Sequence, residues 1–205
     1  MIDNKKGKMI AFEGCEGVGK TTQIERLKKY LDEQGIPYVF SREPGGTETG
    51  EEIRKVLKNE VLDMSPEAEL LLFEAARCDN VKNVLMPALE EGKLVICDRY
   101  IGSTVAYQAF GRGLKRELVD AANEFGSLGL KPDLTIFLDA KPFANTKRSA
   151  SDRMELAGKE FHERVYAGYK KLEEEDESFV SVKTSQDKEE TTERIIKLLK
   201  EKNII

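Results

Sequence analysis

The chain has 205 residues, of which 40 % are hydrophobic and 35 % charged, and this predicts one domain, or one domain with a small lid. Its 33 basic and 38 acidic residues give a net charge of −5, which argues against nonspecific binding to nucleic acid. The single histidine, His162, argues against a multi-histidine zinc site or a histidine-based catalytic triad.

No apolar run approaches the roughly 18–20 residues that cross a bilayer, and residues 1–8 lack the apolar stretch of a signal peptide. We therefore expect a cytoplasmic protein with no membrane or nucleic-acid partner. The three cysteines, Cys15, Cys78 and Cys97, lie far apart and form no CxxC pair, so no disulfide framework is predicted. We interpret His162 as a solvated helix residue without a functional role.

Short apolar runs alternate with amphipathic segments along the chain. The predicted elements, in chain order, are a strand at 9–13, a helix at 20–34, a strand at 36–41, helices at 49–58 and 65–91, a strand at 93–98, helices at 103–110 and 115–128, a strand at 133–139, a helix at 158–173, a strand near 178–182 and a helix at 188–202. This alternation predicts an α/β fold, a parallel sheet with helices on both faces. Ligands bind such sheets beyond the carboxyl ends of the strands, an edge that would carry Gly14, Arg42 and Asp98.

Residues 14–21 match the phosphate-binding pattern G-x-x-x-x-G-K-[ST], with a predicted strand before the match and a predicted helix after it. The N–H groups of the loop and of the helix N-terminus would face the phosphates of a nucleoside triphosphate. Lys20 would reach the β- and γ-phosphate oxygens, and the Thr21 hydroxyl would bind Mg²⁺. The predicted ATP site consists of Gly14, Cys15, Glu16, Gly17, Val18, Gly19, Lys20 and Thr21.

The phosphate loop alone does not define the reaction, because GTPases, transport ATPases and small-molecule kinases share it. The chain has no NKxD guanine motif, since its one Asn-Lys pair, Asn4-Lys5, precedes the first predicted strand. It also has no LSGGQ-like signature of transport ATPases. A kinase remains, and a kinase needs a second anion site for its acceptor.

Two arginines at predicted strand ends are candidates for that anion site. Arg42 begins Arg-Glu-Pro-Gly-Gly after the second strand, and Arg99 lies in Asp-Arg-Tyr after the third. The fork-shaped, permanently charged guanidinium suits phosphate oxygens, so Arg99 could bridge the donor and acceptor phosphates. Asp98 stands where proteins with this loop place a carboxylate near Mg²⁺.

The chain resembles the thymidylate kinase family of the bacterial and archaeal type over nearly its whole length. The segments that carry the resemblance are FEGCEGVGKTTQ at 12–23, REPGGTETGEEIR at 42–54, LLFEAAR at 71–77, CDRYIGSTVAYQAFGRGL at 97–114 and KPDLTIFLD at 131–139. The pairing of REPGG with DRY and S-T-x-A-Y-Q is far more restrictive than the phosphate loop. The resemblance implies a P-loop kinase domain over 1–205 that phosphorylates dTMP to dTDP with ATP and Mg²⁺, for dTTP synthesis, as a homodimer.

The resemblance also implies roles for single residues. Phe73, otherwise a plain core phenylalanine, would stack on thymine, and Arg77 would hydrogen-bond a base carbonyl. Gln108, supported by Thr104, would read the N3 edge of the pyrimidine. The implied substrate-binding set is Arg42, Glu43, Pro44, Phe73, Arg77, Arg99, Thr104, Tyr107 and Gln108, with Tyr107 under the sugar and Arg99 and Arg42 on the acceptor phosphate. The implied metal ligands are Thr21, Asp98 and Glu16.

The polar stretch at about 141–157 resembles the family's lid over ATP. Members of the bacterial type carry a catalytic arginine in the lid and none in the phosphate loop. This chain has Glu16 in the loop and offers Arg153 or Arg148 in the lid. The implied catalytic residues are Lys20, Arg99, Arg153 and Arg148.

Gly102 departs from the family pattern, which usually has aspartate at this position, and we expect the loss of a carboxylate near the phosphates. The alternatives to a dTMP kinase are a kinase for another nucleoside monophosphate or a deoxynucleoside, and a nucleotide-binding protein that has lost transfer activity.

Two interpretations of Cys15 stay open. It either fills a variable loop position or carries a thiol whose pKa is lowered by the helix N-terminus.

Overall fold

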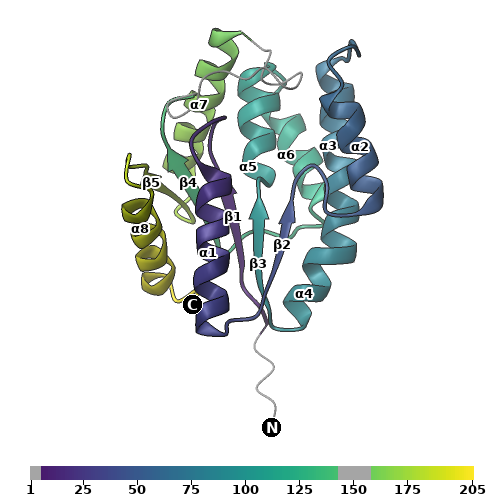
Figure 1. Cartoon of the computed structure of the whole chain (residues 1–205). Coiled ribbons are helices and arrows are strands. Elements are labelled where there is room, and N and C mark those ends of the chain that lie inside the picture. Colours follow the sequence, from purple (N-terminus) through teal and green to yellow (C-terminus); the bar gives the residue numbers. More distant parts are fainter. Residues whose placement is uncertain (1–5, 143–157) are drawn as a thin grey trace.

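A computed structural model describes residues 6–142 and 158–205, which form a five-stranded parallel sheet flanked by helices (Figure 1). The strands are β1 (Met9–Glu13), β2 (Tyr38–Arg42), β3 (Leu94–Asp98), β4 (Leu134–Asp139) and β5 (Phe179–Lys183). Their order across the sheet is β2-β3-β1-β4-β5, and every neighbouring pair is parallel. The predicted parallel α/β fold is confirmed.

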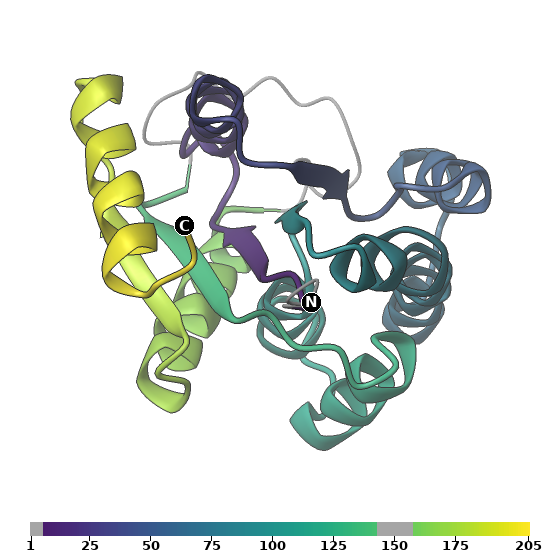
Figure 2. The same cartoon turned by 90° about the horizontal axis from the view of Figure 1, so that it is seen from below.

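Helices cover both faces of the sheet. They are α1 (Lys20–Gln34), α2 (Glu48–Lys58), α3 (Pro66–Asn80), α4 (Met86–Glu90), α5 (Ile101–Thr104), α6 (Arg116–Gly126), α7 (Lys159–Glu175) and α8 (Lys188–Glu201). Two π-helical segments, η1 (Val81–Leu85) and η2 (Val105–Gly111), continue α3 and α5. Figure 2 shows α1 and α8 on one side of the sheet and α5 and α7 on the other. Among the described helices, none is long and apolar enough to span a membrane.

The central strands are buried from end to end because helices cover them on both sides. All five residues of β1 are buried, as are those of β3 and β4 except their last residues, Asp98 and Asp139. These two carboxylates therefore emerge at the carboxyl-terminal edge, which is also where the phosphate loop leaves β1. This edge is where the predicted ligand-binding residues gather.

The two π-helical segments were not predicted, because the sequence indicates plain helices at 65–91 and 103–110. The two segments are only five and seven residues long. Over so short a stretch, the spacing of apolar side chains in a π-helix differs too little from that in an α-helix for the sequence to distinguish them. Pro87 lies just after η1, and a proline ring in a regular helix collides with the carbonyl group four residues earlier. The wider η1 turn relieves this collision. π-helical segments are frequent at functional sites, and η2 carries both Tyr107 and Gln108.

We predict that Leu27→Ala lowers the free energy of unfolding by about 2–5 kcal/mol, because Leu27 of α1 is fully buried in the core. The matched control is Lys29→Ala on the same helix, whose side chain is 80 % exposed, and we expect a change within about 0.5 kcal/mol. Urea denaturation of both variants measures the two values. Equal losses for the two variants would contradict this assignment of the core.

Candidate active site

The phosphate loop runs between β1 and α1 through three glycines with left-handed backbone angles. The φ angles are 144° at Gly14, 70° at Gly17 and 99° at Gly19, a region that side chains other than glycine's disfavour. A Cβ on Gly14 would lie 3.0 Å from Val18 Cγ2 and 3.1 Å from the Leu138 carbonyl oxygen. The tight turn needs glycine for both reasons, and it places the N–H groups of the following residues at the start of α1.

Lys20 lies across the loop that precedes it. Its side chain is buried, and Nζ donates to the carbonyl oxygens of Gly14 (2.8 Å) and Cys15 (3.1 Å). Burial, with the charge of Arg99 as the next cause, lowers the pKa of Lys20 to about 8. An anionic phosphate next to Nζ would raise this pKa again, so this lysine is arranged for an anion.

Asp98 and Thr21 offer oxygen ligands next to the loop. Asp98 Oδ1 is buried and, within residues 6–142 and 158–205, has no hydrogen-bond partner. Thr21 is exposed in the first turn of α1. Mg²⁺ takes oxygen ligands, usually one or two from the protein with the remainder from water and phosphate, so these two residues fit it.

Cys15 is a core residue, and of its two interpretations the one with a lowered thiol pKa is wrong. Its side chain is buried, and this burial, followed by the charge of Glu16, raises its pKa to about 12. Desolvation of the thiolate outweighs the attraction of Lys20 and Arg99. The alternative interpretation, a small residue filling the loop, agrees with this packing.

Arg99 is held at the centre of the site by its backbone and its side chain. Its φ angle of 68° is left-handed, which is rare for a residue other than glycine, and its N–H donates to the Phe12 carbonyl oxygen at 2.9 Å. The guanidinium donates to the Gly14 carbonyl oxygen (3.1 Å) and to Glu16 Oε1 (3.2 Å). Strained backbone of this kind clusters at functional sites. Arg99 thus reaches the phosphate loop, as its position in the sequence predicts.

The Glu16 carboxylate contacts two ring side chains. It accepts from the Tyr107 hydroxyl, and its Oε2 lies 3.5 Å from His162 Nδ1. Burial acts to raise its pKa, but hydrogen bonding from His162 and the charge of Arg99 prevail and lower it to about 2. These contacts do not support the expectation that Glu16 is a metal ligand.

His162 is 2 % exposed, so its interpretation as a solvated residue is wrong. It shares a helical face of α7 with the buried Val165 and Tyr169, and this spacing in the sequence could have indicated its burial. Phe161 packs edge-on against its ring, at 5.3 Å between centroids. His162 is therefore a buried residue that packs next to the Glu16 carboxylate.

A narrow pocket beside the phosphate loop collects most of the residues predicted to bind the acceptor. Its lining consists of Glu43, Phe73, Arg77, Arg99, Tyr100, Ser103, Thr104, Tyr107 and Gln108. Tyr100 and Ser103 were not predicted. The Arg99 guanidinium lies 5.0 Å from the centre of the Tyr107 ring, so one arginine borders both the loop and the pocket.

Arg77 enters the pocket with nearly all of its donors already in use. Nε donates to Glu43 (2.7 Å), Nη1 to Glu74 and Asn123, and Nη2 to Thr104 (2.8 Å). Within the part of the chain that the structure describes, these bonds use four of the five N–H groups of the guanidinium, so one Nη2 hydrogen remains for a ligand. Burial is the main influence on Glu43 and raises its pKa despite the charge of Arg77. The two carboxylates, Glu43 and Glu74, thus fix the orientation of the buried Arg77 guanidinium.

Gln108 is oriented by a carboxylate that sequence reasoning missed. Its Nε2 donates to Glu69 Oε1 at 2.8 Å, and Glu69, which is fully buried, also accepts from Arg112 at 3.0 Å and 3.1 Å. A carboxylate only accepts, so the amide nitrogen of Gln108 must face it. The expected support of Gln108 by Thr104 is replaced by the bond from Arg77 to Thr104.

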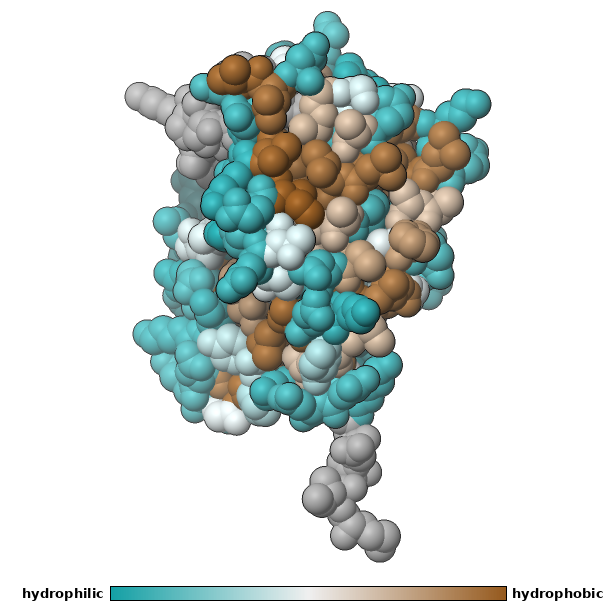
Figure 3. Space-filling model, turned by 90° about the vertical axis from the view of Figure 1, so that its right-hand side faces the viewer, coloured by the Kyte–Doolittle hydropathy of each residue, from teal (hydrophilic) through white to brown (hydrophobic). Residues whose placement is uncertain are grey.

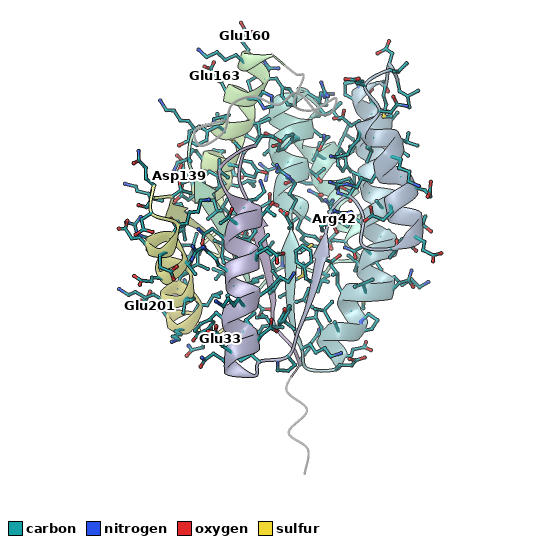
Figure 4. All side chains as sticks on the ribbon, in the orientation of Figure 1. Glu33, Arg42, Asp139, Glu160, Glu163 and Glu201 are labelled. Carbon is teal, nitrogen blue, oxygen red and sulfur yellow. The ribbon has the colours of Figure 1, made fainter. Side chains whose placement is uncertain are left out.

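Arg42 and Pro44 lie outside the pocket lining. Figure 4 shows Arg42 at the carboxyl-terminal end of β2, where its side chain is half-exposed and pairs with Glu51 at 3.0 Å. The Pro44 carbonyl oxygen accepts from Arg54 at 2.7 Å. Of the Arg-Glu-Pro segment, only Glu43 lines the pocket. Arg42 and Pro44 instead bind side chains of α2 and so hold the loop after β2 in place.

Gly102 is buried, and the atoms that a Cβ there would meet do not belong to the phosphate loop. They are Glu13 Oε1 and the Phe179 ring, both at 3.0 Å. The predicted lid arginines, Arg148 and Arg153, fall outside the described residues. The geometry thus brings together a phosphate loop, a magnesium-compatible carboxylate and a second anion pocket that shares Arg99.

Comparisons with known proteins agree with this geometry. The family model described as thymidylate kinase matches residues 12–195. The thymidylate kinase of Pelotomaculum thermopropionicum is 46 % identical over 170 residues, which cover 80 % of this chain and 79 % of that protein. That of Finegoldia magna is 39 % identical over 201 residues, which cover 96 % and 99 %. The crystal structure of thymidylate kinase from Ehrlichia chaffeensis has a TM-score of 0.80 and 33 % identity, and the match covers 95 % of this chain and 99 % of that one. The chain therefore belongs to the thymidylate kinase family of phosphotransferases.

Proposed function

We propose that the protein transfers the γ-phosphoryl group of ATP to dTMP, giving ADP and dTDP for dTTP synthesis. The observation that carries the proposal is the placement of Arg99. Its guanidinium hydrogen-bonds the phosphate loop at Gly14 and also lines the acceptor pocket with Phe73 and Gln108. Two anionic nucleotides can therefore meet head to head with this cation between them.

The donor triphosphate would occupy the loop and the start of α1. Backbone N–H groups and Lys20 would bind its oxygens. Thr21 and Asp98 would hold Mg²⁺, which supplies charge neutralisation on the β- and γ-phosphates. The lid arginines implied by the resemblance, Arg148 and Arg153, would add positive charge over the transferred group.

The pocket chemistry favours a thymine or uracil ring over cytosine. Because Glu69 takes the Gln108 amide nitrogen, the Gln108 carbonyl oxygen is left to accept the N3–H of thymine. Cytosine has no hydrogen at N3, so the same oxygen would face a lone pair, and an unpaired buried polar group is costly. The remaining N–H of Arg77 would donate to a carbonyl group of the base. The Phe73 ring would stack on the pyrimidine, and the Tyr107 ring would pack against the sugar.

The transfer itself needs position and charge more than covalent help. The attacking acceptor oxygen already belongs to a phosphate oxyanion, so no strong general base is required. Arg99 would hold the acceptor phosphate in line with the γ-phosphate and stabilise the charge that spreads over the transferred group.

We predict that ADP release, followed by a coupled assay, is fastest with dTMP, and that kcat/KM for dTMP exceeds that for dCMP by roughly 10²-fold or more. dUMP and UMP complete the comparison, since they test the 5-methyl and 2′-hydroxyl groups. Faster turnover with dCMP or UMP would favour a kinase for another nucleoside monophosphate.

Absence of turnover with all four acceptors would favour a nucleotide-binding protein without transfer activity. Arg99→Ala serves as the mechanistic control in this assay, and we expect kcat/KM for dTMP to fall by roughly 10²–10⁴. Near-normal turnover by the folded variant would contradict the role of Arg99.

A second prediction follows from the lowered pKa of Lys20, which is about 8 in the free protein. At pH 8 roughly half of the Lys20 side chains carry a proton, and a bound triphosphate raises this fraction, so ATP binding should take up roughly half a proton. At pH 7 the lysine is already protonated and the uptake should fall to roughly a tenth. Calorimetry in buffers of different ionisation enthalpy measures the uptake, and equal values at both pH values would contradict the assignment.

We also propose a cytoplasmic homodimer. Exposed apolar side chains gather on the face formed by α2, α3 and α6, as the brown patch in Figure 3 shows. Leu71 of α3 is 66 % exposed, and Leu118 and Phe125 of α6 are 61 % and 79 % exposed. A contiguous exposed apolar face of this kind favours association, and a second copy of the chain would offer the same face.

Analytical ultracentrifugation tests this assembly. We predict a dimer for the unchanged protein and a shift toward monomer for Phe125→Glu, because a buried unpaired carboxylate weakens an apolar interface. Lys29→Glu on α1 changes a charge on another face and should leave the dimer intact. A monomeric unchanged protein would contradict the proposal.

A further inference from the structure

Glu13 is a fully buried carboxylate at the end of β1 that none of the roles above includes. It accepts four hydrogen bonds. The N–H groups of Tyr100 and Ser103 bind Oε1, both at 2.9 Å, while the hydroxyls of Ser103 (2.6 Å) and Tyr169 (2.9 Å) bind Oε2. All four partners donate, which is what an ionised carboxylate requires. A charge buried at this depth is costly unless it is fully hydrogen-bonded, and here it is.

The two hydroxyls that bind Glu13 also contact Arg99. Arg99 Nη1 lies 3.1 Å from Ser103 Oγ, from the Tyr169 hydroxyl oxygen and from the Gly14 carbonyl oxygen, so its two hydrogens are shared among three acceptors. The two hydroxyl oxygens also lie 3.0 Å apart, and either could donate to the other. Each hydroxyl has one hydrogen, so when Glu13 receives both, the lone pairs of both oxygens can accept from the guanidinium. Glu13 thus sets the direction of two hydroxyl groups so that they attract Arg99.

The same carboxylate holds the backbone next to Arg99. The left-handed Arg99 is followed directly by Tyr100, whose N–H donates to Glu13 Oε1. A strained conformation persists only where its surroundings determine it, and Glu13 is part of those surroundings. One side chain therefore acts on both the turn and the guanidinium of Arg99.

We propose that Glu13 is a positioning residue which, through the hydroxyls of Ser103 and Tyr169, holds the Arg99 guanidinium between the donor and acceptor phosphates. The proposal rests on the role given to Arg99 under the proposed function. Gly102 packs directly against this carboxylate, since a Cβ at this position would lie 3.0 Å from Glu13 Oε1.

The test removes one hydroxyl and leaves the ring. Tyr169→Phe deletes the contact with Arg99 while the aromatic ring can still stack on Phe137, at 5.2 Å between centroids. We expect kcat to fall roughly tenfold, which corresponds to about 1.4 kcal/mol of lost transition-state stabilisation, with little change in the KM for ATP. Tyr166→Phe is the matched control on the same helix, because its hydroxyl binds Asp139 instead, and it should keep the wild-type kcat.

A double-mutant cycle separates positioning from general structural support. If Tyr169 acts through Arg99, Tyr169→Phe should change kcat/KM by less than roughly twofold in the Arg99→Ala background. If the hydroxyl only stabilises the fold, its effect should multiply equally in both backgrounds, and this outcome would overturn the proposal. A wild-type kcat for Tyr169→Phe alone would overturn it too.

The cycle also distinguishes failure of this inference from failure of the proposed function. Normal turnover by Arg99→Ala would remove the role of Arg99 itself, whereas a slow Arg99→Ala with multiplicative effects would remove only the role of Glu13. Ser103→Ala deletes the other hydroxyl and goes through the same cycle with the same expectation. It decides the question if Tyr169→Phe does not fold.

Discussion

The site depends on one partly buried cation, the Arg99 guanidinium, at the carboxyl-terminal edge of the sheet. A charge in this position is stable only where acceptors replace its lost water, and the Gly14 carbonyl oxygen, Glu16 and two hydroxyls do so. Gly14 and Glu16 belong to the phosphate loop, while the two hydroxyls come from Ser103 of α5 and Tyr169 of α7. The parallel sheet matters for function because it brings the ends of β1 and β3 side by side, so that these segments meet at Arg99.

The acceptor pocket repeats this principle with other charges. Arg77 is buried against Glu43 and Glu74, and Gln108 against Glu69, which Arg112 neutralises. Desolvation of such pairs offsets much of their attraction, so they contribute less to stability than their number suggests. Their value lies in orientation, because each leaves a defined donor or acceptor pointing at the ligand. A site arranged in this way pays little reorganisation when charge develops during transfer.

Much of this architecture could be predicted from the sequence, because the deciding information is local. Apolar runs and helical spacing located the strands and helices, and the glycine pattern located the phosphate loop. The residues that were misjudged or missed depend on distant segments. Cys15 and His162 are buried only in the folded chain, and Glu69, Asn123 and Glu13 act through partners 39, 46 and 156 residues away. The family resemblance indicated Phe73 and Gln108, but no periodicity in the sequence reveals which carboxylate orients an amide.

The most direct measurement is a crystal structure of the protein with dTMP and a non-hydrolysable ATP analogue bound together. The account predicts the pyrimidine ring against Phe73, with N3 at the Gln108 carbonyl oxygen. It also predicts the monophosphate and the terminal phosphate of the analogue on either side of the Arg99 guanidinium. A pyrimidine bound away from this pocket, or phosphates that meet without Arg99 between them, would contradict it.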